Sequence, residues 1–302
     1  MKLIFGKKVL NLMAGSIDIH IHSAPDVAPR ILNVTDLARH AQEMGMKAIV
    51  LKNHFVETVA QAEITTYETH FPTFGGICLN LTVGGLNPYA VDNALELGAK
   101  FVWLPTFHSK IFIDWFKQKM HSLAHLAAEN RDLTEKKGIY LLNDDGNLKE
   151  EMYPIFDRIA QKGAILATGH ASVKEAKAVV QEAVKRGVKK IVLTHPEAPF
   201  LDYSTQDMRE MLDLGVTYLE FVYCSTTRQV QNSLTPEQLC NAIRPFGPKH
   251  CIMSTDSGQW VNPIPAQQMG MFIRDMLTFG YSEQDIRTMV SDNPASLLGI
   301  SS

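Results

Sequence analysis

Residues 165–170 read Ile-Leu-Ala-Thr-Gly-His and residues 191–195 read Ile-Val-Leu-Thr-His, so a short apolar run twice ends at a histidine. Between the two runs, Ser172 and Glu175 have the spacing of a capping box, and apolar residues at helical spacing continue to Gly187. Unbroken runs of Ile, Leu and Val are typical of strands that are buried on both faces of a parallel sheet. The stretch therefore predicts a strand, a helix and a second parallel strand.

The same alternation continues in both directions along the chain. Strand-like runs begin near Ile17, Met46, Gly76, Lys100, Ala164, Lys190, Val216 and His250. Eight such runs separated by helical patterns predict an α/β fold, a (β/α)8 TIM barrel, in which residues 1–302 form a single domain. An open doubly wound sheet is the rival interpretation, because the same alternation permits it.

One connection, after the fourth strand, is too long for a simple βα unit. About 60 residues lie between Leu104 and Ala164, where roughly 30 complete such a unit. We therefore expect an insertion over residues 105–163 within the barrel. It should hold a helix around residues 114–130 and a short strand over residues 139–142 that leads into a turn.

The composition excludes several classes of protein. The 302 residues are 45% hydrophobic and 20% charged, which excludes a largely disordered chain. The net charge of −3 provides no basic excess for a phosphate backbone, so we expect no nucleic-acid partner. The four cysteines form no C-x-x-C pair, which indicates buried thiols in a reducing compartment.

The start of the chain and its hydropathy predict where the protein resides. The first eight residues, MKLIFGKK, are too short and too charged for a secretory signal. No stretch reaches the roughly 18 apolar residues of a membrane span. We therefore expect a cytoplasmic protein without a membrane partner.

The segment Asp18-Ile19-His20-Ile21-His22 supplies the first candidates for chemistry. Side chains two residues apart on a strand share one face, so His20 and His22 point the same way, about 6–7 Å apart along the strand. Two such imidazoles can converge on one metal ion. A core strand with hydrogen-bonded histidines is the competing interpretation, because an H-x-H pair alone is weak.

Other strand exits carry the same kind of side chain. His170 and His195 follow the two runs quoted first, and Asp256 follows Cys251-Ile-Met-Ser-Thr. In a barrel these exits surround one mouth, where active sites are built. Burying several imidazoles and a carboxylate together is costly unless a cation is present. The nitrogen and oxygen donors suit zinc first, and manganese, iron and nickel are compatible.

The set of motifs resembles the amidohydrolase superfamily of metal-dependent hydrolases. The matching pieces span residues 16–299: Asp18-Ile-His20-Ile-His22, Thr168-Gly-His170, Thr194-His195-Pro196, Ser254-Thr255-Asp256 and the tail Asp292-Asn-Pro-Ala to Gly299. The resemblance implies a distorted barrel with His20, His22, His170 and His195 on metal. It also implies that Asp256 binds metal and accepts a proton from the attacking water.

The chain departs from the common pattern of the superfamily in two places. Only 19 residues precede His20, so we expect a barrel without the flanking β-sandwich that many members carry. Members with two metal ions usually bridge them with a carboxylated lysine or a glutamate at strand four, but here that exit reads Trp103-Leu-Pro-Thr106. Some branches take the bridge from strand two, which ends at Lys52.

Lys52 therefore has three interpretations, namely a carboxylated bridge between two ions, a cation that binds substrate, and a surface lysine. Whether the protein binds one or two metal ions depends on which interpretation of Lys52 holds, and it stays open. The stretch from His22 to Arg30 and from Gly45 to His54 resembles a poorly characterised branch, so the resemblance implies the metal site but no particular substrate.

Four further residues are candidates for binding substrate. Arg30 lies after the first strand, where its guanidinium could hold a carboxylate or phosphate, and a surface position is the alternative. His54 and His108 follow strands two and four. Glu220, on strand seven, is either a polar residue of the pocket or a partner that holds an imidazole from behind.

These observations predict a metal-dependent hydrolase that activates water on one or two divalent ions to cleave an amide, lactam, lactone or ester bond of a small molecule. A single-metal, non-oxidative decarboxylase is the first alternative, because strand four lacks the bridging ligand. A phosphoesterase and a non-catalytic binding protein on the same barrel are further alternatives. Whether the chain forms a homo-oligomer is left open.

Overall fold

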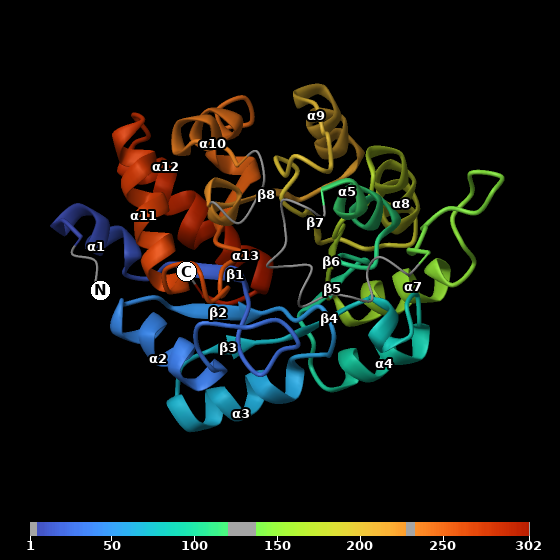
Figure 1. Ribbon diagram of the computed structural model, residues 1–302, viewed down its shortest axis with the longest axis horizontal. Coiled ribbons are helices and arrows are strands. Elements are labelled where there is room, and N and C mark those ends of the chain that lie inside the picture. The colour runs from blue at the N-terminus through green and yellow to red at the C-terminus, as the bar shows by residue number, and fades with distance from the viewer. Residues whose placement is uncertain (1–4, 120–136, 228–232, 302) are drawn as a thin grey trace. The chain divides into compact units, whose positions relative to one another are not determined.

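The structure is a computed structural model that describes residues 5–119, 137–227 and 233–301 (Figure 1). Two compact units make up the chain. The first unit comprises Met1–Lys52, Ala60–Phe74 and Glu220–Ser302, and the second comprises Asn53–Val59 and Gly75–Leu219. The single-domain organisation stays a prediction.

The first unit contains the two ends of the chain. Its elements are α1 (Lys7–Met13), β1 (Ile17–Ile21), α2 (Val34–Glu43), β2 (Ala48–Leu51), α3 (Val59–Thr69), β3 (Thr73–Phe74), η3 (Tyr223–Thr226), α10 (Pro236–Ile243), η4 (Pro248–His250), β9 (Cys251–Ser254), α11 (Pro265–Thr278), α12 (Glu283–Arg287), η5 (Thr288–Asp292) and α13 (Asn293–Leu298). Strand β1 pairs in parallel with β2, and β2 pairs in parallel with β3. All residues of β1, β2 and β9 are buried, as expected for strands covered on both faces.

The second unit contains the middle of the chain. Its elements are β4 (Gly76–Cys78), η1 (Leu81–Val83), α4 (Pro88–Glu96), β5 (Phe101–Trp103), α5 (Lys110–Lys119), α7 (Met152–Lys162), β6 (Ile165–Ala167), α8 (Val173–Lys185), β7 (Ile191–Leu193), α9 (Thr205–Leu214) and the start of β8 (Tyr218–Val222). These strands are also parallel. In hydrogen-bonding order the strands of the chain run β1-β2-β3 and β4-β5-β6-β7-β8-β9.

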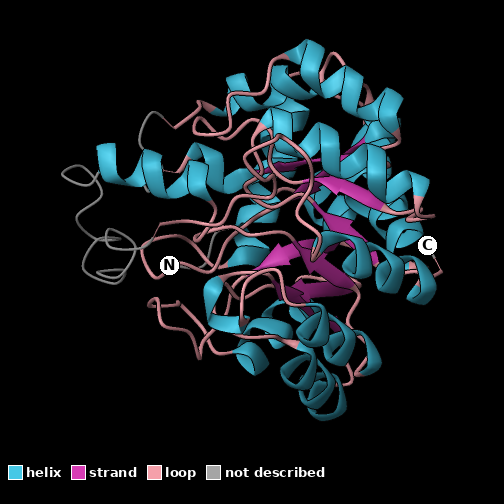
Figure 2. Cartoon of the chain, turned by 90° about the vertical axis from the view of Figure 1, so that its right-hand side faces the viewer, coloured by secondary structure: helices cyan, strands magenta, loops and turns pink. Residues whose placement is uncertain are grey.

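The predicted strand, helix and strand around residues 165–195 are confirmed as β6, α8 and β7. Ser172 caps α8, and its side chain and that of Glu175 form the expected reciprocal capping box. The regular alternation of parallel strands with helices, distinguished by colour in Figure 2, confirms the α/β class.

A short strand that was not predicted precedes the third predicted strand, which was expected to begin near Gly76. Thr73–Phe74 forms β3, which pairs with β2, and Gly76–Cys78 forms β4, which pairs with β5. Gly75 separates them, and a Cβ atom at this position would lie 2.5 Å from the carbonyl oxygen of Thr58. Only glycine fits such a close approach of two backbones. The two-residue β3 was missed because it is too short to show periodicity.

The insertion after β5 differs in detail from the expectation. Helix α5 begins at Lys110, and residues 120–130 of the expected helix lie outside the described residues. The expected strand over residues 139–142 is wrong, because Ile139 and Leu142 make only isolated bridges. The turn that follows is present, since the Asn143 side chain accepts the backbone N–H groups of Asp145 and Asn147.

In the part of the chain that the structure describes, no helix is both long and apolar enough to cross a bilayer.

Candidate metal centre and its surroundings

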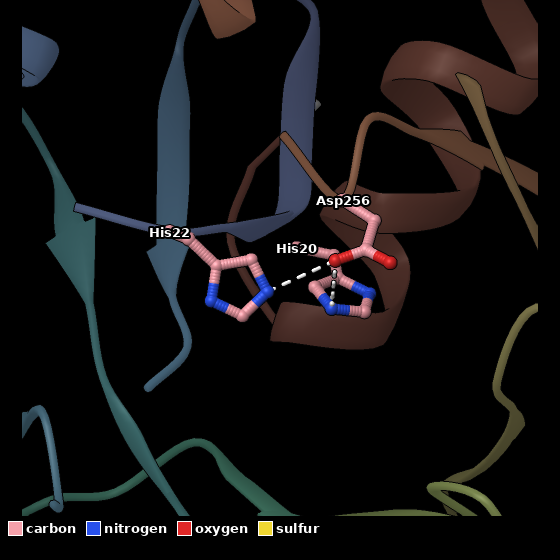
Figure 3. Close-up of side chains that lie close together, drawn as sticks. All are labelled: His20, His22 and Asp256. Atoms are coloured by element: carbon pink, nitrogen blue, oxygen red, sulfur yellow. Dashed lines mark hydrogen bonds and ion pairs between the residues drawn. The ribbon is translucent and has the colours of Figure 1, made fainter. Parts of the chain in front are cut away.

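Three of the predicted ligands meet in the first unit (Figure 3). The Nε2 atoms of His20 and His22 lie 3.0 and 2.9 Å from the same carboxylate oxygen, Oδ1 of Asp256. All three donor atoms lie within 4.8 Å of one another. The side chains of His20 and His22 are 0% and 1% exposed, whereas that of Asp256 is 22% exposed. Asp256 is therefore the member of this cluster that solvent and a ligand can reach.

Backbone contacts bring Asp256 to the two histidines. The Asp256 N–H donates to the carbonyl of His20 at 2.9 Å, and the His22 N–H donates to the carbonyl of Ser257 at 2.7 Å. A Cβ atom at Gly258 would lie 1.9 Å from the carbonyl oxygen of His22, so only glycine permits this approach. Asp256 itself has a left-handed backbone, with φ of 50°. Such strain costs about 1–3 kcal/mol and is typical of functional positions.

Asp18 connects the two strands beneath the cluster. Its buried carboxylate accepts the N–H of Thr255 at 3.1 Å, the Thr255 hydroxyl at 2.6 Å and the N–H of His20 at 3.2 Å. Burial raises the pKa of Asp18 to about 7, although these hydrogen bonds oppose the shift. The sequence analysis gave Asp18 no role of its own. The available signal was its position two residues before His20, on the same face of the strand.

Glu220 holds His20 from behind. Its Oε1 lies 3.1 Å from Nδ1 of His20 and accepts the hydroxyl of Ser254 at 2.7 Å. A carboxylate on one ring nitrogen fixes the tautomer and orientation of the imidazole and raises its basicity at the other nitrogen. Of the two interpretations of Glu220, the geometry supports the partner that holds an imidazole.

Lys52 lies against the other side of His20. Its side chain follows β2, and Nζ lies 2.9 Å from Nε2 of His20. The residue is only 2% exposed, so the interpretation as a surface lysine is wrong. The carboxylated bridge and the substrate-binding cation both remain open.

Electrostatics distribute charge unequally over the cluster. Burial disfavours charge on His20, but the negative charges of Asp256 and Glu220 outweigh burial and Lys52 and raise the pKa of His20 to about 9. Burial, reinforced by the charge of Arg30, lowers the pKa of His22 to about 3. Burial also opposes charge on Asp256, yet the charge and hydrogen bonds of the two histidines hold its pKa well below the usual range. Without metal, a proton on His20 therefore balances the carboxylate at neutral pH.

Arg30 is engaged within its own loop. Its Nε donates to Oδ2 of Asp26 at 2.7 Å, and Nη2 lies 2.7 Å from the same oxygen. The two side chains are 3% and 0% exposed, so the alternative of a surface position is wrong. Contact of Arg30 with a substrate stays a prediction.

The second unit holds the other two histidines. The ring centroids of His170 and His195 lie 5.0 Å apart, and His195 has a left-handed backbone with φ of 29°. Gly169 before His170 also has a positive φ, and a Cβ atom there would lie 2.3 Å from the carbonyl oxygen of Leu104. The Thr-Gly-His sequence is thus required by a close turn at the exit of β6.

A pair of threonines joins these two strand exits. The Thr194 N–H donates to the Thr168 hydroxyl at 3.0 Å, and the Gly169 N–H donates to the Thr194 hydroxyl at 3.2 Å. These contacts were missed in the sequence. The signal was a threonine immediately after each apolar run.

His54 and His108 belong to a buried network that also includes Asn80. Nδ1 of His54 lies 2.8 Å from the Thr106 hydroxyl. The Asn80 amide donates to the His54 carbonyl and to the Thr106 hydroxyl, both at 2.8 Å. Its oxygen accepts the N–H groups of Thr106 at 2.9 Å and His108 at 3.0 Å. Asn80, which the sequence analysis missed, thus connects the segments that carry both histidines.

Solved structures share the fold of this chain at low sequence identity. An amidohydrolase from Pseudomonas aeruginosa is 11% identical with a TM-score of 0.54, covering 96% of this chain and 98% of that one. The 2,6-dihydroxybenzoate decarboxylase from Rhizobium is 10% identical with a TM-score of 0.54, covering 95% and 99%. An organophosphorus hydrolase from Deinococcus radiodurans is 13% identical with a TM-score of 0.59, covering 96% and 94%.

These structures belong to the amidohydrolase superfamily, so the predicted TIM-barrel fold is confirmed and the doubly wound sheet is wrong. Among curated proteins, none matches the sequence. A family model matches residues 15–220, which is more than half of the chain. The protein therefore belongs to the family described as a family of unknown function, DUF6282.

Proposed function

We propose that the protein is a metal-dependent hydrolase that cleaves an amide, lactam, lactone or ester bond of a small molecule. The observation that carries the proposal is the meeting of two buried imidazole nitrogens and one carboxylate oxygen within 4.8 Å at the exits of β1 and β9. The fold supports the class, because the similar structures include an amidohydrolase and an organophosphorus hydrolase. A cytoplasmic location and a small-molecule substrate stay predictions.

The donor set fits a divalent ion. His20, His22 and Asp256 offer two nitrogens and one oxygen, a combination that suits zinc first and manganese, iron or nickel next. We propose His170 and His195 as the remaining ligands, as the resemblance to the superfamily implies. Lys52, if carboxylated, would hold a second ion.

The mechanism assigns the acid–base role to Asp256. A bound divalent ion would lower the pKa of water toward neutrality and polarise the carbonyl of the substrate. Asp256 is ionised at neutral pH because its pKa is low, so its carboxylate accepts the proton of the attacking water. The protonated Asp256 then returns the proton to the leaving group. Glu220 keeps Nε2 of His20 directed at Asp256 through its contact with Nδ1.

The experiment is elemental analysis combined with chelation. We expect purified protein to contain one or two divalent ions per chain, and we expect exhaustive chelation to abolish hydrolysis of an ester and lactone panel until zinc is restored. His20→Ala should lose metal, whereas His40→Ala should not, because the side chain of His40 is 42% exposed and lies outside the cluster. Full turnover by chelated protein would refute the proposal.

Decarboxylation is the second candidate, and the exit of β5 is the observation that favours it. That exit offers Leu104, Pro105 and Thr106 in place of a bridging carboxylate, and the Thr106 hydroxyl is occupied by Asn80 and His54. A site of this kind suits a single ion. Reaction in water enriched in ¹⁸O separates the candidates, because hydrolysis places the label in the product and decarboxylation releases carbon dioxide instead.

A further inference from the structure

Aromatic rings lie beside both histidines of the second unit. The ring of Phe112 lies 5.0 Å from that of His170, measured between centroids. Phe200 lies 4.8 Å from His170 and 6.0 Å from His195. Phe112 comes from α5 and Phe200 from the segment after β7, so two separate parts of the chain bring rings to these imidazoles.

Further rings extend this arrangement into one connected cluster. Phe107 stacks on Phe112 with centroids 5.0 Å apart and an interplanar angle of 1°. Trp115 lies 5.7 Å from Phe112 and 5.3 Å from Phe200. We call Phe107, Phe112, Trp115 and Phe200 the aromatic cluster. Beyond it, His54 stacks on Phe107 at 3.9 Å and 14°.

The aromatic cluster is only partly covered by protein. Phe112 is 5% exposed and packs with Ile113 and Phe116 to form its base. Phe107, Trp115 and Phe200 are partly buried against that base. Phe200 therefore presents an apolar ring beside His170 and His195, and Phe107 and Trp115 extend that apolar surface. An aliphatic or polar group would gain less binding free energy there than a further ring.

We propose that the aromatic cluster binds an aromatic ring of the substrate next to the bond that is cleaved. The substrate class is then an aryl ester, an aromatic lactone or an aroyl amide. This inference rests on the proposed function, because it takes His170 and His195 as ligands of the metal. A ring in offset or edge-to-face contact with such a cluster gains more binding free energy than its buried area alone provides.

Two other classes of substrate fit these surroundings less well. A sugar or another strongly hydrated group would lose water and find no hydrogen-bond partner among phenyl rings. An organic cation can bind aromatic faces, but here it would approach a divalent ion held by the neighbouring imidazoles. Binding of an organic cation is an outcome that the experiment can reveal.

The experiment measures the binding of benzoate, cyclohexanecarboxylate and tetramethylammonium to the full-length protein by calorimetry, with and without zinc. Benzoate and cyclohexanecarboxylate have the same charge and nearly the same size. The ratio of their affinities therefore measures the contribution of the aromatic ring. We expect benzoate to bind about tenfold more tightly than cyclohexanecarboxylate to the zinc form. Phe200→Leu and Phe107→Leu should each reduce that ratio to about threefold, since leucine keeps the site apolar without a ring.

Tyr89→Leu is the matched control, because Tyr89 is 85% exposed and lies outside the aromatic cluster. It should leave the ratio unchanged. Equal affinity for the two carboxylates, tighter binding of tetramethylammonium, or an unchanged ratio in both folded phenylalanine variants would overturn the inference. The zinc dependence reports separately on the proposed function: affinities for both carboxylates that are the same without zinc would refute the metal site but not the aromatic cluster.

Discussion

The candidate ligands of the first unit and those of the second are held by opposite means. His20 and His22 contact charged groups, and a carboxylate lies within hydrogen-bonding distance of each imidazole. His170 and His195 lie among phenyl rings, and backbone turns and threonine hydroxyls shape the strand exits that carry them.

The difference indicates a division of tasks. Charged partners shift the pKa values of the first pair and favour a bound cation, so they belong to the chemistry. The aromatic rings beside the second pair provide apolar surface for a ligand, so we assign them to recognition. Variants of the charged partners should therefore alter catalysis and metal content, and variants of the aromatic rings should alter the choice of substrate.

The largest expected effect is that of Asp256→Asn. The amide cannot accept the proton of the attacking water, so we expect the turnover number to fall by about 10²–10⁴-fold. The variant keeps an oxygen within reach of His20 and His22 and should remain folded. Circular dichroism and metal content check the fold, and stopped-time product assays measure turnover.

Asp144→Asn is the matched control, since Asp144 lies in the exposed turn after residue 143. It should leave turnover unchanged. If Asp256→Asn retained the turnover of the wild type, the first unit would not contain the base and the division of tasks would be wrong.

Glu220→Gln should produce the next largest effect. The change keeps the size of the side chain but removes the negative charge that supports Nδ1 of His20. Substitution of such a partner typically lowers metal affinity by about 10–100-fold. Competition with a chromogenic chelator measures the affinity directly. The exposed Glu283 provides the control variant Glu283→Gln, and equal affinities in the two variants would mean that Glu220 only fills space.

Asn80→Ala tests the second unit through the stability of the fold. It removes a fully buried amide whose nitrogen and oxygen each bond two partners, so we expect a loss of about 2–3 kcal/mol in the free energy of unfolding. Urea titration measures this loss. Metal affinity should change little, since the Asn80 side chain bonds His54, Thr106 and His108, none of which is a proposed metal ligand. Asn241→Ala on the exposed face of α10 is the control. A metal affinity that fell as in Glu220→Gln would show that the two regions are not independent.

The parts of the molecule that were predictable from sequence are local. The strands that end at His170 and His195 and the capping box of α8 are each decided by a few adjacent residues. The convergence of His20 and His22 follows from strand geometry. Assignment of Asp256 to the same cluster required the barrel as an assumption, because it lies 234 residues from His22.

The parts that were missed depend on contacts between distant residues. Asp18 acquires its role only through Thr255, which is 237 residues away. Asn80 joins His54 to Thr106, each 26 residues distant, and nothing near Asn80 in the sequence indicates it. Trp115 was expected as a helix residue, but its position beside Phe112 and Phe200 depends on how α5 packs. Local patterns therefore predict candidate ligands better than they predict the partners that hold them.

The smallest expected effect is the pH dependence of stability in the metal-free protein, and it examines the first unit alone. Interaction with Asp256 and Glu220 outweighs burial and raises the pKa of His20 to about 9, above the value of about 6.5 in an unfolded chain. Between these two values the folded protein holds a proton that the unfolded chain has lost. The stabilisation is therefore complete below pH 6.5 and disappears as the pH rises through 9.

We expect the free energy of unfolding of the metal-free protein to fall from pH 7 to pH 8.5, and His20 contributes a slope of at most about 1.4 kcal/mol per pH unit. Urea titration at each pH measures this slope. Asp18 adds to the slope only near pH 7, because its pKa is about 7 and most of its contribution is lost at lower pH. The buried thiols of Cys240 and Cys251, whose pKa values are raised by burial, also destabilise the fold at high pH. The thiols have this effect with and without zinc. The contribution of His20 should disappear in the zinc form, because the bound metal takes the place of its proton. The slope should therefore be shallower in the zinc form, and equal slopes would mean that no cation occupies the position of that proton.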